Sequence, residues 1–282
     1  MTMSLERDGF LSNTIAGLAD EAWKHYCPRH VALVMRANQF AISVSATPRD
    51  LQRRDADLLA ALFLARAIHD FEGAVLLGRL GLRAQSRAMV RSTFETALYC
   101  VAASQDLVLV NGAKRKPKKG DPPTTKFVQA FQEAHQRFRR QVATDLQAAE
   151  DLPPEQSAAL DALLQDLGAL GELQDIDVRG LAKDLGLSSL YTNVYRALSQ
   201  DAHPSAISLE HHVALSSEGK IAGLQFGPDY LQFADTLALA VCSLLVALEG
   251  FVERFGAPEE ADALRALVAE YRSLLEDLDG PK

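Results

Sequence analysis

Arg196 and His203 are the two residues whose types and spacing are best suited to chemistry. They stand seven positions apart, and because a helix turns by about 100° per residue, they lie within about 20° of each other on its surface. Asn193 and Gln200 are close to the same face. A cation, two amides and an imidazole therefore share one side of a predicted helix, which makes that side a candidate polar site. Pro204 disfavours helical geometry at the residue before it, so His203 belongs to the end of the helix.

The opposite side of this helix is apolar. If Ser188 is the N-cap, one stripe is formed by Leu190, Tyr191, Val194, Tyr195 and Leu198. Arg196 lies about 160° from the middle of that stripe, so the stripe packs into the core while Arg196 faces outward. The same pattern also describes an ordinary surface helix with a solvated polar face, and the helix dipole favours a histidine in the last turn. A purely structural interpretation therefore stays open.

A second polar row lies on a long helix predicted from Arg83 to about Val110. Arg87, Arg91 and Glu95 follow one another at intervals of four, beside an apolar stripe. The row either flanks the core as salt bridges, or it tilts inward as part of a polar site between helices. In the second case the candidate binding residues of the two helices are Arg91, Glu95, Asn193, Tyr195, Ser199 and Gln200.

A metal site is not expected. The sequence has no Cys-x-x-Cys pair and no Glu-x-x-His, and the adjacent His211 and His212 would point to opposite faces of a strand. If the two helices pack together, a polar cluster of Arg91, Glu95, Tyr195 and His203 can form, although the sequence does not decide whether Arg91 and Glu95 meet His203, and its arginine repels a cation. The cluster is better suited to a small molecule or to a structural role, and no cofactor is expected.

Part of the same stretch matches the helix-turn-helix pattern of DNA-binding proteins. Leu181 to Ser188 resembles the first helix and the turn, with the expected spacing of four between Ala182 and Gly186. The apolar residue expected six positions after the glycine is Thr192 instead, and the next helix is more apolar than a groove-reading helix should be. Because the whole chain is also acidic, sequence-specific DNA binding is not expected.

Two motifs on these helices resemble known families. The order of Arg196, six intervening residues and His203 is similar to the signature of the HEPN superfamily (higher eukaryotes and prokaryotes nucleotide-binding). More specifically, the sequence resembles a bacterial family of uncharacterised helical proteins, domain of unknown function 5677. The residues that carry this likeness are Arg91-Ser92-Thr93-Phe94-Glu95, Tyr195-Arg196-Ala197-Leu198-Ser199 and His203-Pro204-Ser205. The resemblance covers residues 50 to 255, interrupted by residues 111 to 175.

This resemblance implies a function. Many HEPN proteins are metal-independent ribonucleases, and others bind nucleotides or RNA without catalysis. By that likeness His203 would be a general acid or base on the 2′-hydroxyl or the leaving oxygen, since the ordinary histidine pKa of about 6.5 suits neutral pH. Arg196 would hold the phosphate and stabilise its developing charge. The superfamily commonly assembles its site across a dimer, so a homodimer is expected. The residue after the arginine is usually polar in active members and is Ala197 here, a departure that bears on catalysis more than on the fold.

The rest of the chain predicts an all-α protein, because its long Ala- and Leu-rich stretches show no alternation of period two. We expect one domain over residues 1–282, a helical bundle whose core comes from residues 48–110 and 176–278. The first core helix should open at Thr47-Pro48-Arg49-Asp50, where a capping threonine precedes a proline at the first helical position.

Residues 111–175 are the least core-like part and are expected to be a lid-like insertion. Its basic loop, residues 114–119, is either a solvated loop or an arm that attracts phosphate. A short β-hairpin is expected between His211 and Phe226, on either side of Glu218-Gly219.

Composition narrows the functional classes. A net charge of −8 disfavours a broad nucleic-acid surface, although a local basic patch remains compatible with it. The 3 cysteines are far apart and fit buried free thiols in a reducing compartment. The apolar run from Leu237 to Leu248 is shorter than the roughly 20 residues of a membrane span, so a core helix and a cytoplasmic protein are expected.

The leading hypothesis is a nucleotide- or RNA-binding protein, acting as a metal-independent ribonuclease in a toxin or defence setting. The alternative is a non-catalytic helical interaction or regulatory protein.

Overall fold

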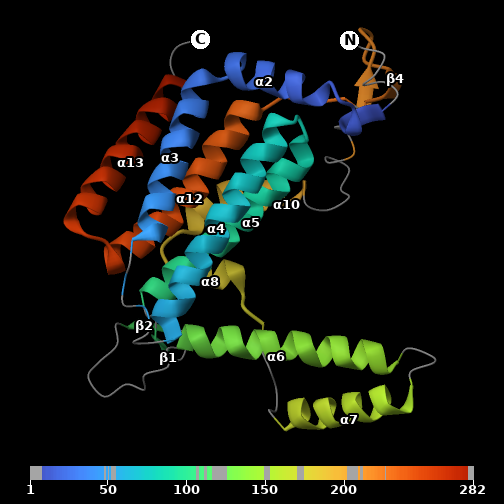
Figure 1. Cartoon of the computed structure of the whole chain (residues 1–282), viewed down its shortest axis with the longest axis vertical. Helices are drawn as coiled ribbons and strands as arrows, with labels where there is room; N and C mark the ends of the chain where they lie inside the picture. The colour runs from blue at the N-terminus through green and yellow to red at the C-terminus, as the bar shows by residue number, and fades with distance from the viewer. Residues whose placement is uncertain are drawn as a thin grey trace.

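The computed structural model describes residues 8–47, 49, 51, 55–105, 108–110, 113–115, 126–148, 153–169, 175–201, 209, 212–225 and 227–278. Within them the chain is all-α with two short antiparallel hairpins, which confirms the predicted fold class (Figure 1). His203 and His211 lie outside the described residues, as do residues 116–119 of the predicted basic loop.

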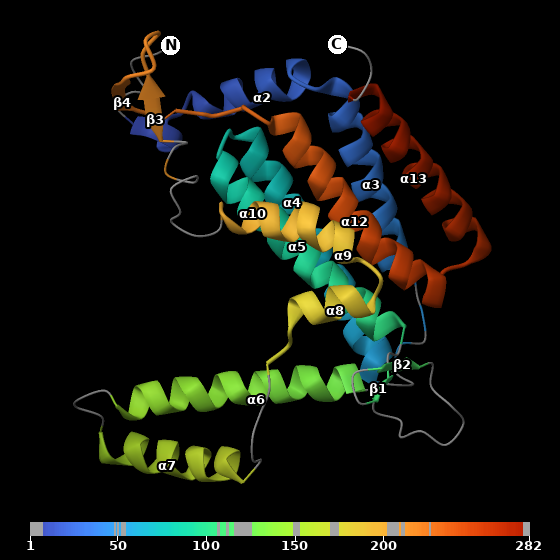
Figure 2. The same cartoon turned by 180° about the vertical axis from the view of Figure 1, so that it is seen from behind.

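Three helices form the centre of the bundle and lie side by side in Figures 1 and 2. They are α4 (Asp55–Arg79), α5 (Arg83–Ser104) and α12 (Phe233–Phe255). Because α12 is apolar nearly all round, it is buried on most sides, as expected of a helix at the centre of a core. α12 has the length and composition of a membrane-crossing helix, and 78% of its most apolar window is buried inside the structure.

Two further helices cover α12 on one side, and a third crosses the end of the bundle (Figure 1). They are α3 (Pro28–Ala46), α13 (Pro258–Leu278) and α2 (Ile15–His25), the last preceded by the short η1 (Gly9–Leu11). An ion pair ties the end of α3 to the start of α13. Arg49, only 9% exposed, reaches both carboxylate oxygens of Glu260 at 2.6 Å and stacks over the ring of Phe251.

Two predicted helix boundaries were wrong. α4 is described from Asp55 and not from Thr47, which is the residue after the last turn of α3 and donates its hydroxyl to the Ser43 carbonyl there. α5 ends at Ser104 and does not continue to Val110, because Val108–Val110, which has a β-branched valine at each end, forms a strand instead.

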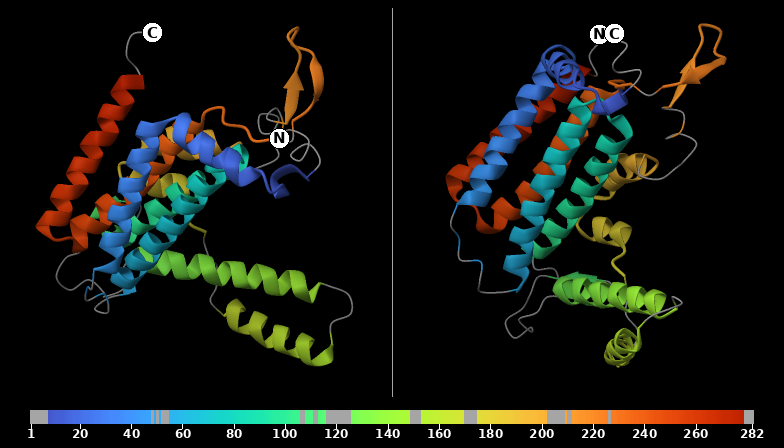
Figure 3. Two further views of the ribbon diagram at one scale, coloured as in Figure 1. Left: turned by 45° about the horizontal axis from the view of Figure 1, so that its top comes forward. Right: turned by 45° about the vertical axis from the view of Figure 1, so that its right-hand side comes forward.

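The middle excursion forms a helical arm. It consists of β1 (Val108–Val110) and β2 (Ala113–Arg115), which pair as a hairpin, and of α6 (Lys126–Gln147) and α7 (Pro154–Gly168), which pack against each other. At its N-terminal end α6 is fixed to the bundle by a cluster of rings, Phe63, Tyr99, Phe127 and Phe131. The rest of α6 and all of α7 project away from the bundle (Figure 3).

The predicted hairpin is present at the other end of the molecule. β3 (Val213–Leu215) pairs antiparallel with β4 (Ile221–Leu224), with Val213 opposite Leu224 and a bulge between Ala214 and Leu215. Gly219 occupies the left-handed region at φ 73° in the turn. This hairpin also extends beyond the bundle in Figure 3.

A short chain of helical turns lies across α5 and carries the residues singled out from the sequence (Figure 2). It runs through α8 (Val178–Asp184), α9 (Ser188–Leu190), the π-helical turn η2 (Tyr191–Arg196) and α10 (Ala197–Ser199). α8 ends in a turn closed by Gly186 at φ 76° and by a hydrogen bond from the Leu187 N–H to the Ala182 carbonyl. The core side of these turns is held by Val194 and Leu198, which are fully buried.

Candidate functional site

The π-helical turn decides which side chains share a face. In a π-helix the backbone bonds join residues five apart, so such residues lie above one another, whereas in an α-helix they are about 140° apart. Tyr191 and Arg196 are five apart and bound the same cavity. The sequence prediction of an unbroken α-helix placed Tyr191 in the packed stripe and Arg196 on the far side. In the structure Tyr191 packs against the core as predicted, but it also bounds the cavity together with Arg196. Leu187 takes the N-cap position that was predicted for Ser188.

The cavity beside Arg196 has a volume of about 610 Å³ and a basic lining. Arg179 and Lys183 of α8 and Arg196 of η2 line it, together with Tyr191 and Thr192. Three cations around one hollow attract an anion, and arginine in particular suits the paired oxygens of a phosphate. The cavity therefore fits a phosphate-bearing ligand.

One carboxylate also lines the cavity, and it has a structural task. Asp177 is the N-cap of α8, where its side chain accepts the backbone N–H of Arg179 at 3.0 Å. The lining residues therefore carry three positive charges and one negative charge. Thr192 adds a hydroxyl that is bonded to the Ser188 carbonyl at 3.1 Å.

The structure brings the second predicted group of residues together, but their polar side chains bond to one another. Arg91 donates through Nε to the Ser199 hydroxyl at 3.1 Å and through its other nitrogen to the Tyr195 hydroxyl. Its guanidinium lies 4.3 Å above the Tyr195 ring and 3.7 Å from a Glu95 oxygen. Glu95 in turn accepts the hydroxyl of Tyr99 at 3.0 Å. Each polar group thus finds a partner within the chain, so this cluster clamps η2 and α10 onto α5.

The electrostatics of the clamp agree with a structural role. Burial raises the pKa of Tyr195, and the negative charge of Glu95 raises it further, while Arg91 opposes both effects. Burial raises the pKa of Tyr99 as well, and Glu95 adds to the shift through charge and a hydrogen bond. Both phenols therefore stay neutral hydrogen-bond donors at physiological pH.

The arginine row extends further than the sequence interpretation had it. Arg87 pairs with Asp201 at 2.8 Å, and the two side chains are 13% and 3% exposed. One turn earlier, Arg83 pairs with Asp229 at 3.1 Å. Because Arg83 continues the interval of four backwards from Arg87, the spacing itself held a signal that this residue belongs to the row.

A buried carboxylate on α4 was missed altogether. Asp70, 3% exposed, accepts from Arg66 at 2.8 Å, from Ser92 at 2.9 Å and from Thr96 at 3.4 Å. Sequence periodicity gave Asp70 no particular role, and only the packing of α4 on α5 shows that the carboxylate is enclosed. It joins the two helices through its hydrogen bonds to Ser92 and Thr96 of α5.

The remaining predicted residues are not all gathered at one place. Asn193 and Gln200 are exposed and do not line the basic cavity. His203 lies outside the described residues. Tyr191 and Tyr195 stack on each other at 5.1 Å and pack against the core, so this face is not free to enter a DNA groove as a recognition helix would.

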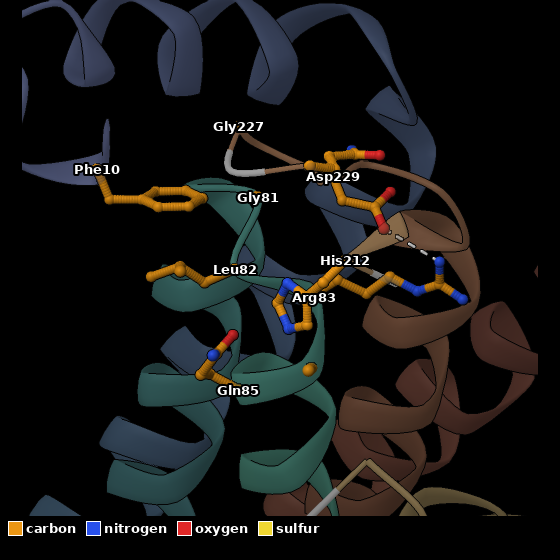
Figure 4. A pocket seen from close by; sticks show the side chains of 10 residues that line it. Phe10, Gly81, Leu82, Arg83, Gln85, His212, Gly227 and Asp229 are labelled. Atoms are coloured by element: carbon orange, nitrogen blue, oxygen red, sulfur yellow. Dashed lines mark hydrogen bonds and ion pairs between the residues drawn. The ribbon is translucent and has the colours of Figure 1, made fainter. Parts of the chain in front are cut away.

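A smaller cavity of about 230 Å³ lies at the turn between α4 and α5 (Figure 4). Phe10, Leu82 and His212 are among its lining residues, and Arg83 reaches across to Asp229. These two opposite charges are already paired with each other. The cavity is therefore less suited to a phosphate than the cavity beside Arg196.

Comparison with known proteins places the site in a family. A model described as "Family of unknown function (DUF5677)" matches residues 57–221, which is more than half of the chain and reaches from α4 to the first residue of β4. The arginine row, the clamp and the basic cavity all lie within this span. No curated protein and no solved structure matches the chain. Among the described residues no group of three His, Cys, Asp or Glu is placed to hold a metal ion.

Proposed function

The chain belongs to the DUF5677 family, and we propose that it is a HEPN-like protein that binds RNA or a nucleotide through the cavity beside Arg196 and cleaves RNA without a metal ion. The observation that supports this most directly is the convergence of Arg179, Lys183 and Arg196 on one cavity of about 610 Å³. The family is itself of unknown function, so the proposal rests on the site.

The lining of the cavity suits a nucleotide better than a free phosphate. The three cations meet the negative charge of the phosphate, and the Tyr191 ring beside Arg196 offers a surface to a sugar or a base. Arg196 is exposed, so a phosphate reaches it without displacing core residues. Exposure also leaves it able to face the site of a second copy, as the dimeric sites of the resembled superfamily require.

The proposed reaction is an internal transesterification. His203 takes the proton of the RNA 2′-hydroxyl, the 2′-oxygen forms a bond to the adjacent phosphorus, and the bond from phosphorus to the 5′-oxygen breaks. The leaving 5′-oxygen receives a proton from solvent and His203 releases its own to solvent, so the products are a 2′,3′-cyclic phosphate and a 5′-hydroxyl. Arg196 stabilises the charge that develops on the phosphate oxygens. No redox change or external reactant is needed.

A second function, non-catalytic binding, is favoured by one observation. The residue after Arg196 is Ala197, which is exposed and cannot donate or accept a hydrogen bond through its side chain. The resembled ribonucleases usually carry a polar residue there. A protein that binds RNA or a partner without cleaving it would keep the basic cavity and would not need that group.

RNA-cleavage assays in the presence of EDTA test the proposal. We expect the wild type to release cyclic-phosphate ends, and His203→Ala to lose about 10²- to 10⁴-fold of the rate, the usual range for a general acid or base. Asn193→Ala is a matched control, because Asn193 is an exposed neighbour that does not line the cavity. Equal and negligible cleavage by the wild type and His203→Ala would end the ribonuclease claim. Binding that survives in Arg179→Ala/Arg196→Ala would end the claim for the cavity.

A further inference from the structure

We propose that Phe138 of α6, with Arg137 and Arg139 beside it, forms a base-stacking contact that continues the basic cavity, so that the ligand is single-stranded RNA and not a free nucleotide. This inference rests on the proposed function of the cavity. It gives a task to the exposed arm, which the cavity alone does not explain.

The position of Phe138 follows from the geometry of α6. At about 100° and 1.5 Å per residue, Phe138 lies within about 20° of Phe127 and Phe131 on the helix surface and about 16 Å beyond Phe127 along it. Phe127 and Phe131 pack on Phe63 and Tyr99 of the bundle. Phe138 therefore continues the side of α6 that is turned toward the bundle.

No described residue covers Phe138, which is 64% exposed. α7 packs on a different side of α6, where Ala143 is buried and Arg140 donates to the Leu167 carbonyl. An aromatic ring left open at this position is a surface on which a base can stack, and such stacking tolerates any base because each has a π-face.

The charges beside the ring point to a nucleic acid. Arg137 and Arg139 flank Phe138 in the sequence, and both are exposed. Arg139 donates to the amide oxygen of Gln136 at 3.2 Å, so its positive charge is not neutralised by that contact. Arg137 is 3.5 Å from an Asp175 oxygen, so Arg139 is the arginine available to a phosphate. An exposed aromatic residue beside it combines a stacking surface with a phosphate contact, a combination that the basic loop at residues 114–119 lacks because it has no aromatic residue.

The arm is connected to the basic cavity. Arg137 of α6 lies 3.5 Å from Asp175, two residues before Asp177, which lines the cavity. Figure 2 shows α6 running beneath α8, the helix that supplies Arg179 and Lys183. A chain of nucleotides with one phosphate at Arg196 therefore has a second basic and aromatic surface on the neighbouring element.

An apolar partner protein is the competing occupant. Val142 and Leu146 extend the stripe of Phe138 along α6 and are 38% and 48% exposed. A protein partner would contact all three side chains, whereas an RNA base would contact Phe138 and leave the two aliphatic residues aside. Val142 is therefore the control that separates the two occupants.

Binding measurements on the full chain test the inference. The probes are fluorescein-labelled 2′-O-methyl dodecauridine, which lacks the 2′-hydroxyl needed for cleavage, and uridine 5′-monophosphate. We expect Phe138→Ala to weaken binding of the dodecamer by about 5- to 150-fold, the range for loss of one base–aromatic stack. Binding of the monophosphate should not change. Phe138→Trp should restore the affinity, Val142→Ala should leave it unchanged, and Arg139→Gln should reduce the salt dependence by about one phosphate contact.

The outcomes separate this inference from the function on which it rests. If the wild type binds neither probe, the proposed function fails and the inference falls with it. If the wild type binds both probes and Phe138→Ala binds them equally well, the cavity stands and the inference is overturned. The inference is also overturned if Val142→Ala weakens binding of the dodecamer as much as Phe138→Ala does. It is likewise overturned if either substitution changes the oligomeric state of the protein in solution, because the stripe is then a protein-docking surface.

Discussion

Replacing Arg91 by methionine should destabilise the fold while replacing Arg196 by methionine should not, although both arginines belong to the same candidate region. Arg91 clamps η2 and α10 onto α5 through Tyr195 and Ser199. Arg196 is exposed and lines the cavity. The pair therefore distinguishes an arginine that holds the site in place from an arginine that is free to bind.

The magnitude follows from the contacts of Arg91. A hydrogen bond to a charged group contributes about 1.5–3 kcal/mol, and a cation over an aromatic ring adds about 0.5–2 kcal/mol. Methionine keeps some packing on the Tyr195 ring, and the Ser199 hydroxyl keeps its bond to the Tyr195 carbonyl at 2.6 Å. Arg91 is also 24% exposed, which screens part of its charge. We therefore expect a loss of about 2–4 kcal/mol for Arg91→Met, and less than about 0.5 kcal/mol for Arg196→Met.

Urea unfolding followed by circular dichroism measures both values. A double-mutant cycle of Arg91→Met with Tyr195→Phe isolates the bond between guanidinium and phenol, for which we expect a coupling of about 1–3 kcal/mol. In a binding assay with dodecauridine the order should be reversed, with Arg196→Met the more damaging change under conditions where both variants are folded. Zero coupling in the cycle, or a larger loss of stability for Arg196→Met, would refute the division of roles.

Two further predictions concern the rest of the bundle. Burial raises the pKa of Glu260, but hydrogen bonds from Arg49 and the Ala257 N–H outweigh it and bring the pKa below its ordinary value of 4.5. The ion pair should therefore stabilise the fold above about pH 4.5 and lose that contribution as the pH falls through the lowered pKa. The melting temperatures of wild type and Glu260→Gln should accordingly differ at pH 7 and converge in acid. Burial raises the pKa of Cys27 to about 11 and that of Cys100 to about 12, and it raises the pKa of Cys242 as well. Because all three thiols are buried and free, Ellman's reagent should react with them only in denaturant, and fast labelling of the native protein would contradict the packing of the core.

The long helices could be predicted because their apolar residues recur with the helical period over many turns. α13 begins at Pro258, and a proline at the first helical position is a start signal that the sequence itself carries. The wrong start at Thr47 has a physical cause. A threonine hydroxyl can accept a backbone N–H at the start of a helix or donate to a carbonyl in the last turn of one, and here it donates to the Ser43 carbonyl. Arg49 pairs with Glu260, which is 211 residues away in the sequence, so no local sequence pattern indicates this pairing.

The candidate site was predictable only in part, for a similar reason. The interval of four from Arg87 to Glu95 indicated a polar row, and the alternative of an inward tilt toward Tyr195 describes what the Arg91 side chain does. The partners Asp201 and Asp229 come from distant segments, so sequence periodicity does not identify them. The cavity itself depends on Arg179 and Lys183 of α8, and the helix-turn-helix pattern that includes Lys183 gave neither residue a role in such a cavity.

The π-helical turn from Tyr191 to Arg196 has a consequence for how such a site arises and is lost. A π turn holds one more residue than the α-helical turn it replaces, so it acts as a single-residue insertion that the helix has absorbed without breaking. Deleting one residue from this run would return the segment to α-helical geometry and leave the residues after it in nearly the same phase relative to Tyr191, whereas an α-helix with all the residues of the run would turn them by about 100°. The extra residue therefore enlarges the surface that this turn offers to the cavity while the segments before and after it keep their relative phase, so the helix tolerates an insertion that would otherwise turn its following side chains by about 100°.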